Sequence, residues 1–273
     1  MAIDATARIA DGARVADGAD VGPYCIVGPN VVLEPRVRLI GHVNVSGVTK
    51  IGVGTLVYPF CSLGTPPQSV HYRGGPTKLI IGAHCELREH VTINTGTEAG
   101  GGVTAVGEGC LLMVGAHVGH DCTVGNNVTF ANNAMLGGHV SIGNDVFLGG
   151  QCAVHQFVRI GEGAMVAGLS GIAADIIPFG FALGQVATLV GLNTVGLRRR
   201  GATRADLHAL RRAYQAMFLG GGVLADRIRC VARDFADDPL VGKIVAFTCA
   251  SGKRPLMQPR MKHEGGERDD DEA

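Results

Sequence analysis

The sequence lacks the features that mark membrane, secreted and nucleic-acid-binding proteins. No segment is long and apolar enough to span a membrane, and residues 1–20 carry acids and glycines where a signal peptide has a basic start and an apolar core. The 24 Lys and Arg residues balance the 24 Asp and Glu residues, so no overall positive charge favours nucleic acid. We therefore expect a cytoplasmic protein with no membrane insertion and no nucleic-acid partner.

Tryptophan is absent, and the eight cysteines include no Cys-x-x-Cys motif. Without a secretory context, we expect the cysteines to be reduced thiols rather than disulfides. Glycine, in contrast, is abundant, with 42 among 273 residues. The glycines follow a period, and this period organises the chain.

Apolar residues recur every six positions through most of residues 9–172, often followed by glycine, as in Val21-Gly22 and Ile51-Gly52. This hexapeptide period indicates a parallel β-helix. An α-helix, with about 3.6 residues per turn, or a strand, with a period of about 2, would not sustain it. Three hexads build one triangular coil, so residues eighteen apart stack on neighbouring coils. Hexapeptide proteins wind left-handed, a hand that periodicity alone does not show.

The apolar residues of this period, called repeat residues below, are predicted to face the core. Six cysteines fall four positions after a repeat residue, where Ala, Thr or Val stands in other hexads. A thiol is a small apolar filler. We therefore expect buried side chains at Cys25, Cys61, Cys85, Cys110, Cys122 and Cys152.

The period divides the chain into three parts. We expect a β-helix domain over residues 1–185, a small α-helical domain over residues 186–255 and a disordered acidic tail over residues 256–273. Residues 64–78 and 95–105 break the period and are predicted loops, where binding residues tend to lie.

Three helices are predicted in the second part. Thr203 followed by Asp206 resembles a capping box, which opens a helix that runs to about Phe218. The glycines 220–222 end this helix. Residues 223–235 and 239–249 are two further predicted helices.

The stretch VGAHVGHDCTVG, residues 114–125, holds two histidines, an aspartate and a cysteine within six positions. Stacking by eighteen places His120 below Gly138, Gly138 below Gln156, and His139 above Asp121. One edge of three consecutive coils therefore gathers His117, His120, Asp121, His139 and His155.

Several interpretations of this edge are open. A tetrahedral zinc site would need convergent ligands, but Cys122 faces the core whereas His117 and His120 face outward. A histidine-only metal edge, as in the γ-class carbonic anhydrases, lacks here the two closely spaced histidines that follow a long gap in that family. The imidazoles could also simply bond to turns. We expect no metal, with His120 as a general base that Asp121 orients and Gly138 offering a backbone N–H to an oxyanion.

Residues 1 to about 250 resemble the UDP-N-acetylglucosamine 3-O-acyltransferases, which begin lipid A synthesis. The motifs that carry the resemblance occur in the family's order and spacing and read VGPYCIVGP, GGGVTAVG, LLMVGAHVGHDCTVG, NNAMLGGHVSIG, AVHQFVRIG, LSGIAADI and GLRRRG. The resemblance implies a homotrimer of left-handed β-helices with active sites between subunits. An R-3-hydroxyacyl chain would move from acyl carrier protein to the UDP-sugar, and no cofactor is implied.

The resemblance also implies roles for single residues. His120 would be the base, Asp121 would orient it, and the Gly138 N–H would hold the oxyanion. The positions expected to line the sugar, phosphate and pantetheine sites are His117, His139, His155 and Gln156.

Further positions match the two ends of the substrates. Gly168 matches the position that sets acyl length, where a missing side chain would admit a longer chain. Asn193, Arg199 and Arg200 match the nucleotide and phosphate end, where guanidinium groups suit phosphate. The same arginines could instead cap helices or attract the acidic carrier protein.

The chain departs from the family in its first loop and near Asn193. Many members read Gln-Asp-x-Lys where this chain has Gln68-Ser69-Val70-His71, and Val195 replaces a glutamate. A lysine would repel a protonated 3-amino group, whereas a histidine can be neutral. We therefore expect Gln68, Ser69 and His71 to contact a sugar that can carry a 3-amino in place of a 3-hydroxyl group.

Two rival functions are open. The N-acyltransferase of the same pathway also uses a hexapeptide solenoid, but it has an additional N-terminal uridine-binding domain, whereas the period here starts at Ile9. A non-catalytic solenoid is the other alternative, and the His120–Asp121 edge argues against it.

Overall fold

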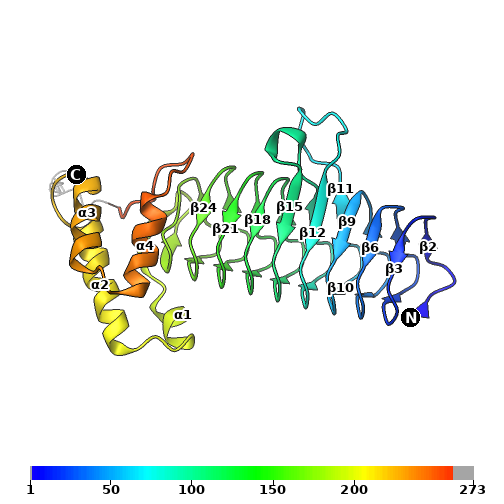
Figure 1. The fold of residues 1–273 in the computed structure, drawn as a ribbon, viewed down its shortest axis with the longest axis horizontal. Coiled ribbons are helices and arrows are strands. Elements are labelled where there is room, and N and C mark those ends of the chain that lie inside the picture. Colours follow the sequence, from blue (N-terminus) through cyan, green and yellow to red (C-terminus); the bar gives the residue numbers. More distant parts are fainter. Residues whose placement is uncertain (1, 261–273) are drawn as a thin grey trace, which may run out of the picture.

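The structure, a computed structural model, describes residues 2–260. It is a long prism of stacked triangular coils, with a group of helices at its C-terminal end (Figure 1). Each side of the prism is a sheet of short parallel strands, and the described residues form three such sheets. We call these sheets A, B and C.

Sheet A has eleven strands within the described residues, and only its last pair is antiparallel. In chain order they are β1 (Ala2–Ile3), β4 (Asp20–Val21), β7 (Arg38–Leu39), β10 (Leu56–Val57), β13 (Glu86–Leu87), β16 (Leu111–Leu112), β19 (Thr129–Phe130), β22 (Phe147–Leu148), β25 (Met165–Val166), β27 (Gly180–Leu183) and β28 (Thr188–Leu192).

Sheets B and C complete the prism. Sheet B consists of β2 (Arg8–Ile9), β5 (Ile26–Val27), β8 (Asn44–Val45), β11 (Ser62–Thr65), β14 (Thr92–Asn94), β17 (His117–Val118), β20 (Met135–Leu136), β23 (Ala153–Val154) and β26 (Gly171–Ile172). Sheet C consists of β3 (Arg14–Val15), β6 (Val31–Leu33), β9 (Val48–Ile51), β12 (Lys78–Ile81), β15 (Val103–Val106), β18 (Thr123–Val124), β21 (Ser141–Ile142) and β24 (Arg159–Ile160).

The repeat residues fill the core, as the period predicts. Val118 pairs in register with Leu136, and both are at most 1% exposed. The six cysteines predicted to fill the core are at most 2% exposed and are free thiols. Burial raises the pKa of the Cys61 and Cys122 thiols to about 12, so they stay protonated at neutral pH.

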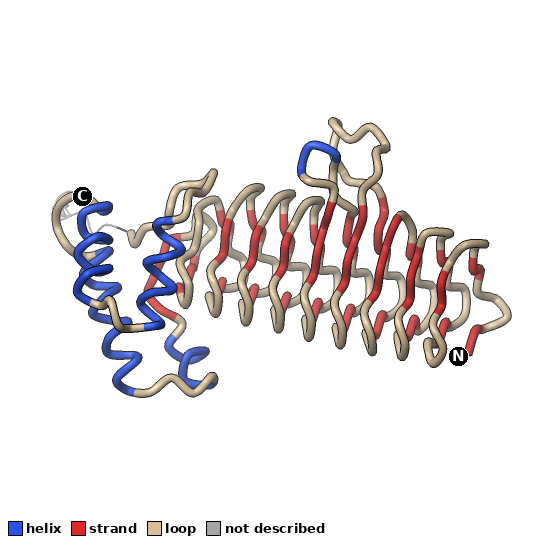
Figure 2. The backbone as a smooth tube through the Cα atoms, in the orientation of Figure 1, coloured by secondary structure: helices blue, strands red, loops and turns tan. Residues whose placement is uncertain are grey.

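Two insertions project from the same side of the prism, between β11 and β12 and between β14 and β15 (Figure 2). The second contains a short 3-10 helix, Glu98–Gly100, and ends earlier than predicted because Val103 already belongs to β15. The Glu98 carboxylate accepts hydrogen bonds from the backbone N–H groups of Gly75, at 2.5 Å, and Arg73, at 3.3 Å. The two loops therefore support each other.

Four helices follow the solenoid: α1 (Thr194–Arg199), α2 (Arg204–Phe218), α3 (Leu224–Asp234) and α4 (Pro239–Cys249). The capping box at Thr203 and Asp206 is present, and the last three helices lie where the sequence predicts them. Helix α1 was not predicted, because its six residues are too few to show a period. In the part of the chain that the structure describes, no helix is long and apolar enough to cross a membrane.

The predicted domain boundaries need two changes. Strand β28 pairs with β27, so sheet A extends seven residues beyond the predicted end of the β-helix at residue 185. Residues 256–260 are not part of a disordered tail, because Met257 is 2% exposed and its N–H donates to the Asp175 carbonyl, at 2.8 Å. Residues 261–273 lie outside the described residues.

Candidate active site

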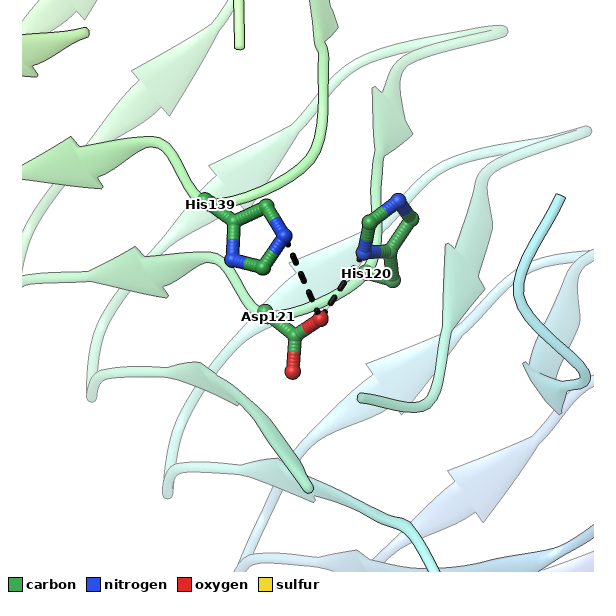
Figure 3. Close-up of side chains that lie close together, drawn as sticks. All are labelled: His120, Asp121 and His139. Carbon is green, nitrogen blue, oxygen red and sulfur yellow. Dashed lines mark hydrogen bonds and ion pairs between the residues drawn. The ribbon is translucent and has the colours of Figure 1, made fainter. Parts of the chain in front are cut away.

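A hydrogen-bonded histidine–carboxylate pair lies at the corner between sheets B and C (Figure 3). His120 Nδ1 is 2.8 Å from Asp121 Oδ2. The Asp121 side chain is fully buried, whereas the His120 side chain is 11% exposed. An ionised carboxylate only accepts hydrogen bonds, so the hydrogen lies on Nδ1 and a neutral His120 keeps its lone pair on Nε2. This is the arrangement of a general base with an orienting partner.

The second insertion and strand β15, which follows it, supply further hydrogen bonds of Asp121. The Thr97 N–H donates to Asp121 Oδ1 at 2.9 Å, and the Thr97 hydroxyl donates to Oδ2 at 2.6 Å. The Asp121 N–H in turn donates to the Thr104 hydroxyl at 2.8 Å. A Cβ atom on Gly100 would overlap the Asp121 carboxylate, so this glycine is needed for the close approach of the loop.

These contacts decide the charge of the site. Burial alone would raise the pKa of Asp121, but the hydrogen bonds from Thr97 and His120 outweigh it and hold the pKa below its ordinary value. Burial lowers the pKa of His139, more than the neighbouring carboxylate raises it. Burial also lowers the pKa of His117. At neutral pH the site therefore contains an ionised Asp121 carboxylate and neutral imidazoles at His117 and His139.

The next coil packs directly against this pair. The His139 ring meets the His120 ring edge-on at 5.0 Å and stacks on Phe157 at 4.4 Å between centroids. Gly138 lies over the imidazole, since a Cβ atom there would come within 2.5 Å of His120 Cε1 and 2.6 Å of Nε2. The absent side chain at Gly138 therefore lets His120 keep its position beside Asp121.

His120 opens into a groove on the outer face of sheet B, which we call groove B. Its volume is about 320 Å³. It is lined by Gln68, Asn94, His117, Gly119, His120, Met135, Leu136, Gly137, Gly138, Ala153, Val154 and Gln156.

A separate groove lies on sheet A, and we call it groove A. Its volume is about 470 Å³, and its lining includes Asn193, Val195, Arg199 and Arg200. The Asn193 amide is used within the chain: Oδ1 accepts from the Gly196 N–H at 2.9 Å, and Nδ2 donates to the Gly163 carbonyl at 3.0 Å. The charged side chains that line groove A are the two exposed guanidinium groups and the carboxylate of Asp145.

Comparison with known proteins assigns the chain to a family. A family model described as UDP-N-acetylglucosamine O-acyltransferase, domain 2, matches residues 175–257, and a bacterial transferase hexapeptide model matches residues 104–138. An acyl-(acyl-carrier-protein) UDP-N-acetylglucosamine O-acyltransferase of Azorhizobium caulinodans is 58% identical over 94% of this chain and 95% of that protein. The chain belongs to the UDP-N-acetylglucosamine O-acyltransferase family.

Other members of the family agree in sequence and fold. The enzyme of the same name from Rhizobium etli is 45% identical over 83% of each chain. The crystal structure of the UDP-N-acetylglucosamine O-acyltransferase from Moraxella catarrhalis superposes with a TM-score of 0.91, at 38% identity, over 94% of this chain and all of that one. The left-handed parallel β-helix predicted for this acyltransferase is confirmed.

The structure of this O-acyltransferase family member brings part of the predicted site together. Groove B unites the five predicted residues Gln68, His117, His120, Gly138 and Gln156, and Asp121 and His139 lie beside His120 (Figure 3). Asn193, Arg199 and Arg200 line groove A instead. Ser69 and His71 lie on the first insertion outside both linings, and the Ser69 hydroxyl accepts the His71 N–H at 3.3 Å.

Two predicted residues of the acyltransferase lie beyond groove B. Gly168 is exposed. A Cβ atom there would make one close contact, at 3.2 Å to the Gly150 carbonyl oxygen, and its next nearest neighbour would be the Gly150 backbone nitrogen at 3.8 Å. His155 lines a lateral groove of about 310 Å³, together with the aliphatic residues Val154, Ile172 and Val186. A lining of this kind suits an apolar chain.

Side-chain positions also bear on the metal alternative. Among the described residues, His120, Asp121 and His139 offer ligand atoms within 4.8 Å of one another. Asp121 Oδ2, however, already accepts hydrogen bonds from His120 and from the Thr97 hydroxyl. Hydrogen bonds therefore already occupy the carboxylate oxygen that a metal ion would need. The absence of a metal is still a prediction.

Several residues of the site escaped the sequence analysis. Thr97 and Thr104 belong to the segment where the period breaks, so stacking by eighteen could not place them. Asn94 continues β14 into groove B, and its Nδ2 donates to the Pro66 carbonyl at 3.1 Å. Lys253 and Arg254 come from beyond α4 and contact Phe157 and His155. The only sequence signal that could have pointed to such residues was the prediction that loops carry binding residues.

Proposed function

We propose that this protein transfers an R-3-hydroxyacyl chain from acyl carrier protein to the 3-position of UDP-N-acetylglucosamine, in the cytoplasm and as the first step of lipid A synthesis. The observation that carries the proposal is the His120–Asp121 pair in groove B, on a chain of the UDP-N-acetylglucosamine O-acyltransferase family. The proteins named as relatives carry both substrates in their names.

His120 acts as the general base. Its Nε2 takes the proton of the sugar 3-hydroxyl as the oxygen attacks the thioester carbonyl carbon. The buried carboxylate of Asp121 stabilises the imidazolium that forms. As the tetrahedral intermediate collapses, the C–S bond breaks and the thiolate receives the proton from His120, which restores the neutral base.

Gly138 provides the oxyanion contact. Among the described residues its N–H has no hydrogen-bond partner, and its backbone lies over the His120 ring. A free N–H beside the base can donate to the oxygen that becomes negative during attack. No metal is required in this scheme.

The active protein is a homotrimer. Within one chain, the base opens onto sheet B, while Arg199 and Arg200 lie in groove A on a different face of the prism. A UDP-sugar that contacts both His120 and these arginines needs groove B of one chain to lie beside groove A of another chain. Cyclic packing of three prisms provides this arrangement, and sedimentation at monomer mass with full activity would contradict it.

The remaining predicted residues take their roles from this arrangement. His117, His139 and Gln156 border the base and contact the sugar and the pantetheine arm. Gly168 leaves room for a long acyl chain. Asn193 holds the start of α1, whose Arg199 and Arg200 bind either the nucleotide phosphates or the acidic carrier protein.

The sugar can carry a 3-amino group. Ser69 and His71 replace the aspartate and lysine of many relatives, so the first insertion offers no fixed ammonium that would repel an amine. Competition between the 3-hydroxyl and 3-amino UDP-sugars, read as the ratio of kcat/KM, tests this part. A tenfold or greater advantage of the hydroxyl sugar would refute it and leave the O-acyltransferase reaction intact.

Incubation with a mixture of hydroxyacyl carrier proteins tests the function itself. Mass spectrometry of the product is expected to show a hydroxyacyl chain on UDP-N-acetylglucosamine and to report the preferred length. No acylated nucleotide from either UDP-sugar would overturn the proposal. Acylation only of a UDP-sugar that already carries an acyl group at position 3 would favour the N-acyltransferase.

A further inference from the structure

The segment after α4 returns to the solenoid beside the active-site edge, where Figure 1 shows it as the red-orange chain next to the last coils. We call residues 252–258 the C-terminal strap. Asp175 anchors it: the Asp175 N–H donates to the Pro255 carbonyl and the Met257 N–H donates to the Asp175 carbonyl, both at 2.8 Å. The buried Met257 side chain fixes the strap further.

The anchored strap places Arg254 against the turn that holds His155. Arg254 Nε donates to the Gln156 carbonyl at 2.8 Å, and Nη2 lies 2.5 Å from His155 Nδ1. A guanidinium group has five N–H donors and no acceptor. The His155 nitrogen that faces it must therefore carry the lone pair, which places the ring hydrogen on Nε2.

A competing contact would give the opposite tautomer. His155 Nδ1 also lies 3.3 Å from the Gln156 carbonyl, and a hydrogen on Nδ1 could be donated there. This contact is longer than both contacts of Arg254, and Arg254 Nε already occupies the carbonyl. Charge-assisted hydrogen bonds are also about twice as strong as neutral ones. The two hydrogen bonds of the Arg254 guanidinium group therefore determine the tautomer of His155.

We infer that Arg254 is a positioning residue of the acyl transfer: it fixes His155, which lines the apolar lateral groove, as the tautomer that carries its ring hydrogen on Nε2. The mainly aliphatic lining suits the acyl chain of the acyl-pantetheine arm, and the Nε2–H donor suits an amide or thioester carbonyl oxygen of the same arm. The choice of this ligand rests on the proposed function, whereas the tautomer does not. Arg254, which lies outside the solenoid, thus determines which ring nitrogen of His155, within the solenoid, is the hydrogen-bond donor.

Nitrogen NMR of the full-length protein labelled at histidine reports which ring nitrogen bears the hydrogen, without any substrate. The wild type is expected to show His155 protonated on Nε2. In Arg254→Met, which keeps the length of the side chain but removes every donor, the hydrogen is expected to move at least partly to Nδ1, toward the freed Gln156 carbonyl. Arg254→Lys restores one donor and is expected to lie between the two.

Kinetics then separate positioning from structural support. Arg254→Met is expected to raise KM for acyl carrier protein about tenfold, the loss of roughly one hydrogen bond, and to leave KM for the UDP-sugar within about twofold. Arg233→Gln removes an exposed arginine of α3 that contacts Asp234, and serves as the matched control. An equal rise in both KM values would show a merely structural role.

The wild-type spectrum is decisive even if Arg254→Met does not fold. Hydrogen on Nδ1 of His155 in the wild type overturns the inference, and so does an unchanged tautomer in a folded Arg254→Met protein. If the tautomer behaves as expected and no UDP-sugar is acylated, the proposed function fails while the role of Arg254 in fixing His155 stands.

Discussion

Two corners of the solenoid have the same backbone and different chemistry. In the N-terminal coils, Tyr24, His42 and Phe60 follow one another along a corner, with φ angles of 56°, 51° and 66°. In the coils of the candidate site, the corresponding trio is Asp121, His139 and Phe157, with φ angles of 58°, 62° and 66°. Each central histidine stacks on the phenylalanine above it, at 5.2 Å for His42 and 4.4 Å for His139.

The residues that precede each trio sharpen the comparison. They are Pro23, Gly41 and Pro59 in the first corner, and His120, Gly138 and Gln156 in the second. Both central positions are glycine, and both glycines lie over the residue one coil below. A corner histidine stacked on phenylalanine is therefore a structural feature of this solenoid, and only a carboxylate and a second imidazole on the coil below turn it into a candidate site.

The largest effect is expected from His120→Ala. Loss of a general base typically costs roughly 10² to 10⁴-fold in rate. The matched change in the first corner, Pro23→Ala, is expected to leave turnover near the wild-type value. Acylation rates of the two purified proteins measure the contrast, and near-full activity of a folded His120→Ala protein would refute the assignment of the base.

Gly138→Ala is expected to lower kcat by about 10 to 100-fold. The new Cβ would lie within 2.6 Å of two atoms of the His120 ring, so the ring must shift from Asp121, and small misplacements of catalytic groups have effects of this size. In Gly41→Ala the new Cβ would lie 3.3 Å from the Pro23 carbonyl oxygen. Equal losses of kcat in both variants would mean that the glycine serves only the backbone structure of the corner.

Thr97→Val is expected to lower kcat by about fivefold and to shift the acid limb of the pH–rate profile to higher pH. The variant removes the 2.6 Å hydrogen bond to Asp121 Oδ2, so the pKa of this carboxyl rises and the ionised form is lost at a higher pH. Thr6→Val removes a similar hydroxyl–carboxylate bond to Asp4 on the exposed N-terminal coil. That control should leave the profile unchanged, and an unshifted profile in Thr97→Val would contradict the role of Thr97.

The smallest effect concerns stability. Burial lowers the pKa of His139, so below about pH 6.5 the unfolded chain binds a proton more readily than the folded one, and the protein loses stability as pH falls. His139→Gln removes this contribution. The drop in Tm between pH 7.5 and about 5.5 should therefore be smaller than in the wild type, by less than about 3 °C. An identical drop in both proteins would contradict the burial of a neutral imidazole.

Local patterns predicted the scaffold well. The hexapeptide period placed the repeat residues and the six core cysteines, and Thr203 and Asp206 placed the start of α2, because each of these signals depends on residues a few positions apart. Stacking by eighteen also gave the column of His120, Gly138 and Gln156. Periods cannot show the packing of an insertion or of a terminal segment. Thr97, Thr104 and Arg254 were missed for this reason, and residues 256–260 were wrongly assigned to a disordered tail.

By itself, the sequence determined the solenoid, its phase and the edge on which the histidines gather, because a strict period translates directly into a stacked position. Only the tertiary structure decided what that edge can do. The carboxylate of Asp121 stays ionised because a loop from outside the period brings Thr97 to it. The ring nitrogen of His155 that carries the hydrogen is set by Arg254, which lies on a strap anchored at Asp175. Both contacts join residues separated by an irregular stretch of chain, and the length of such a stretch does not specify where its end will pack.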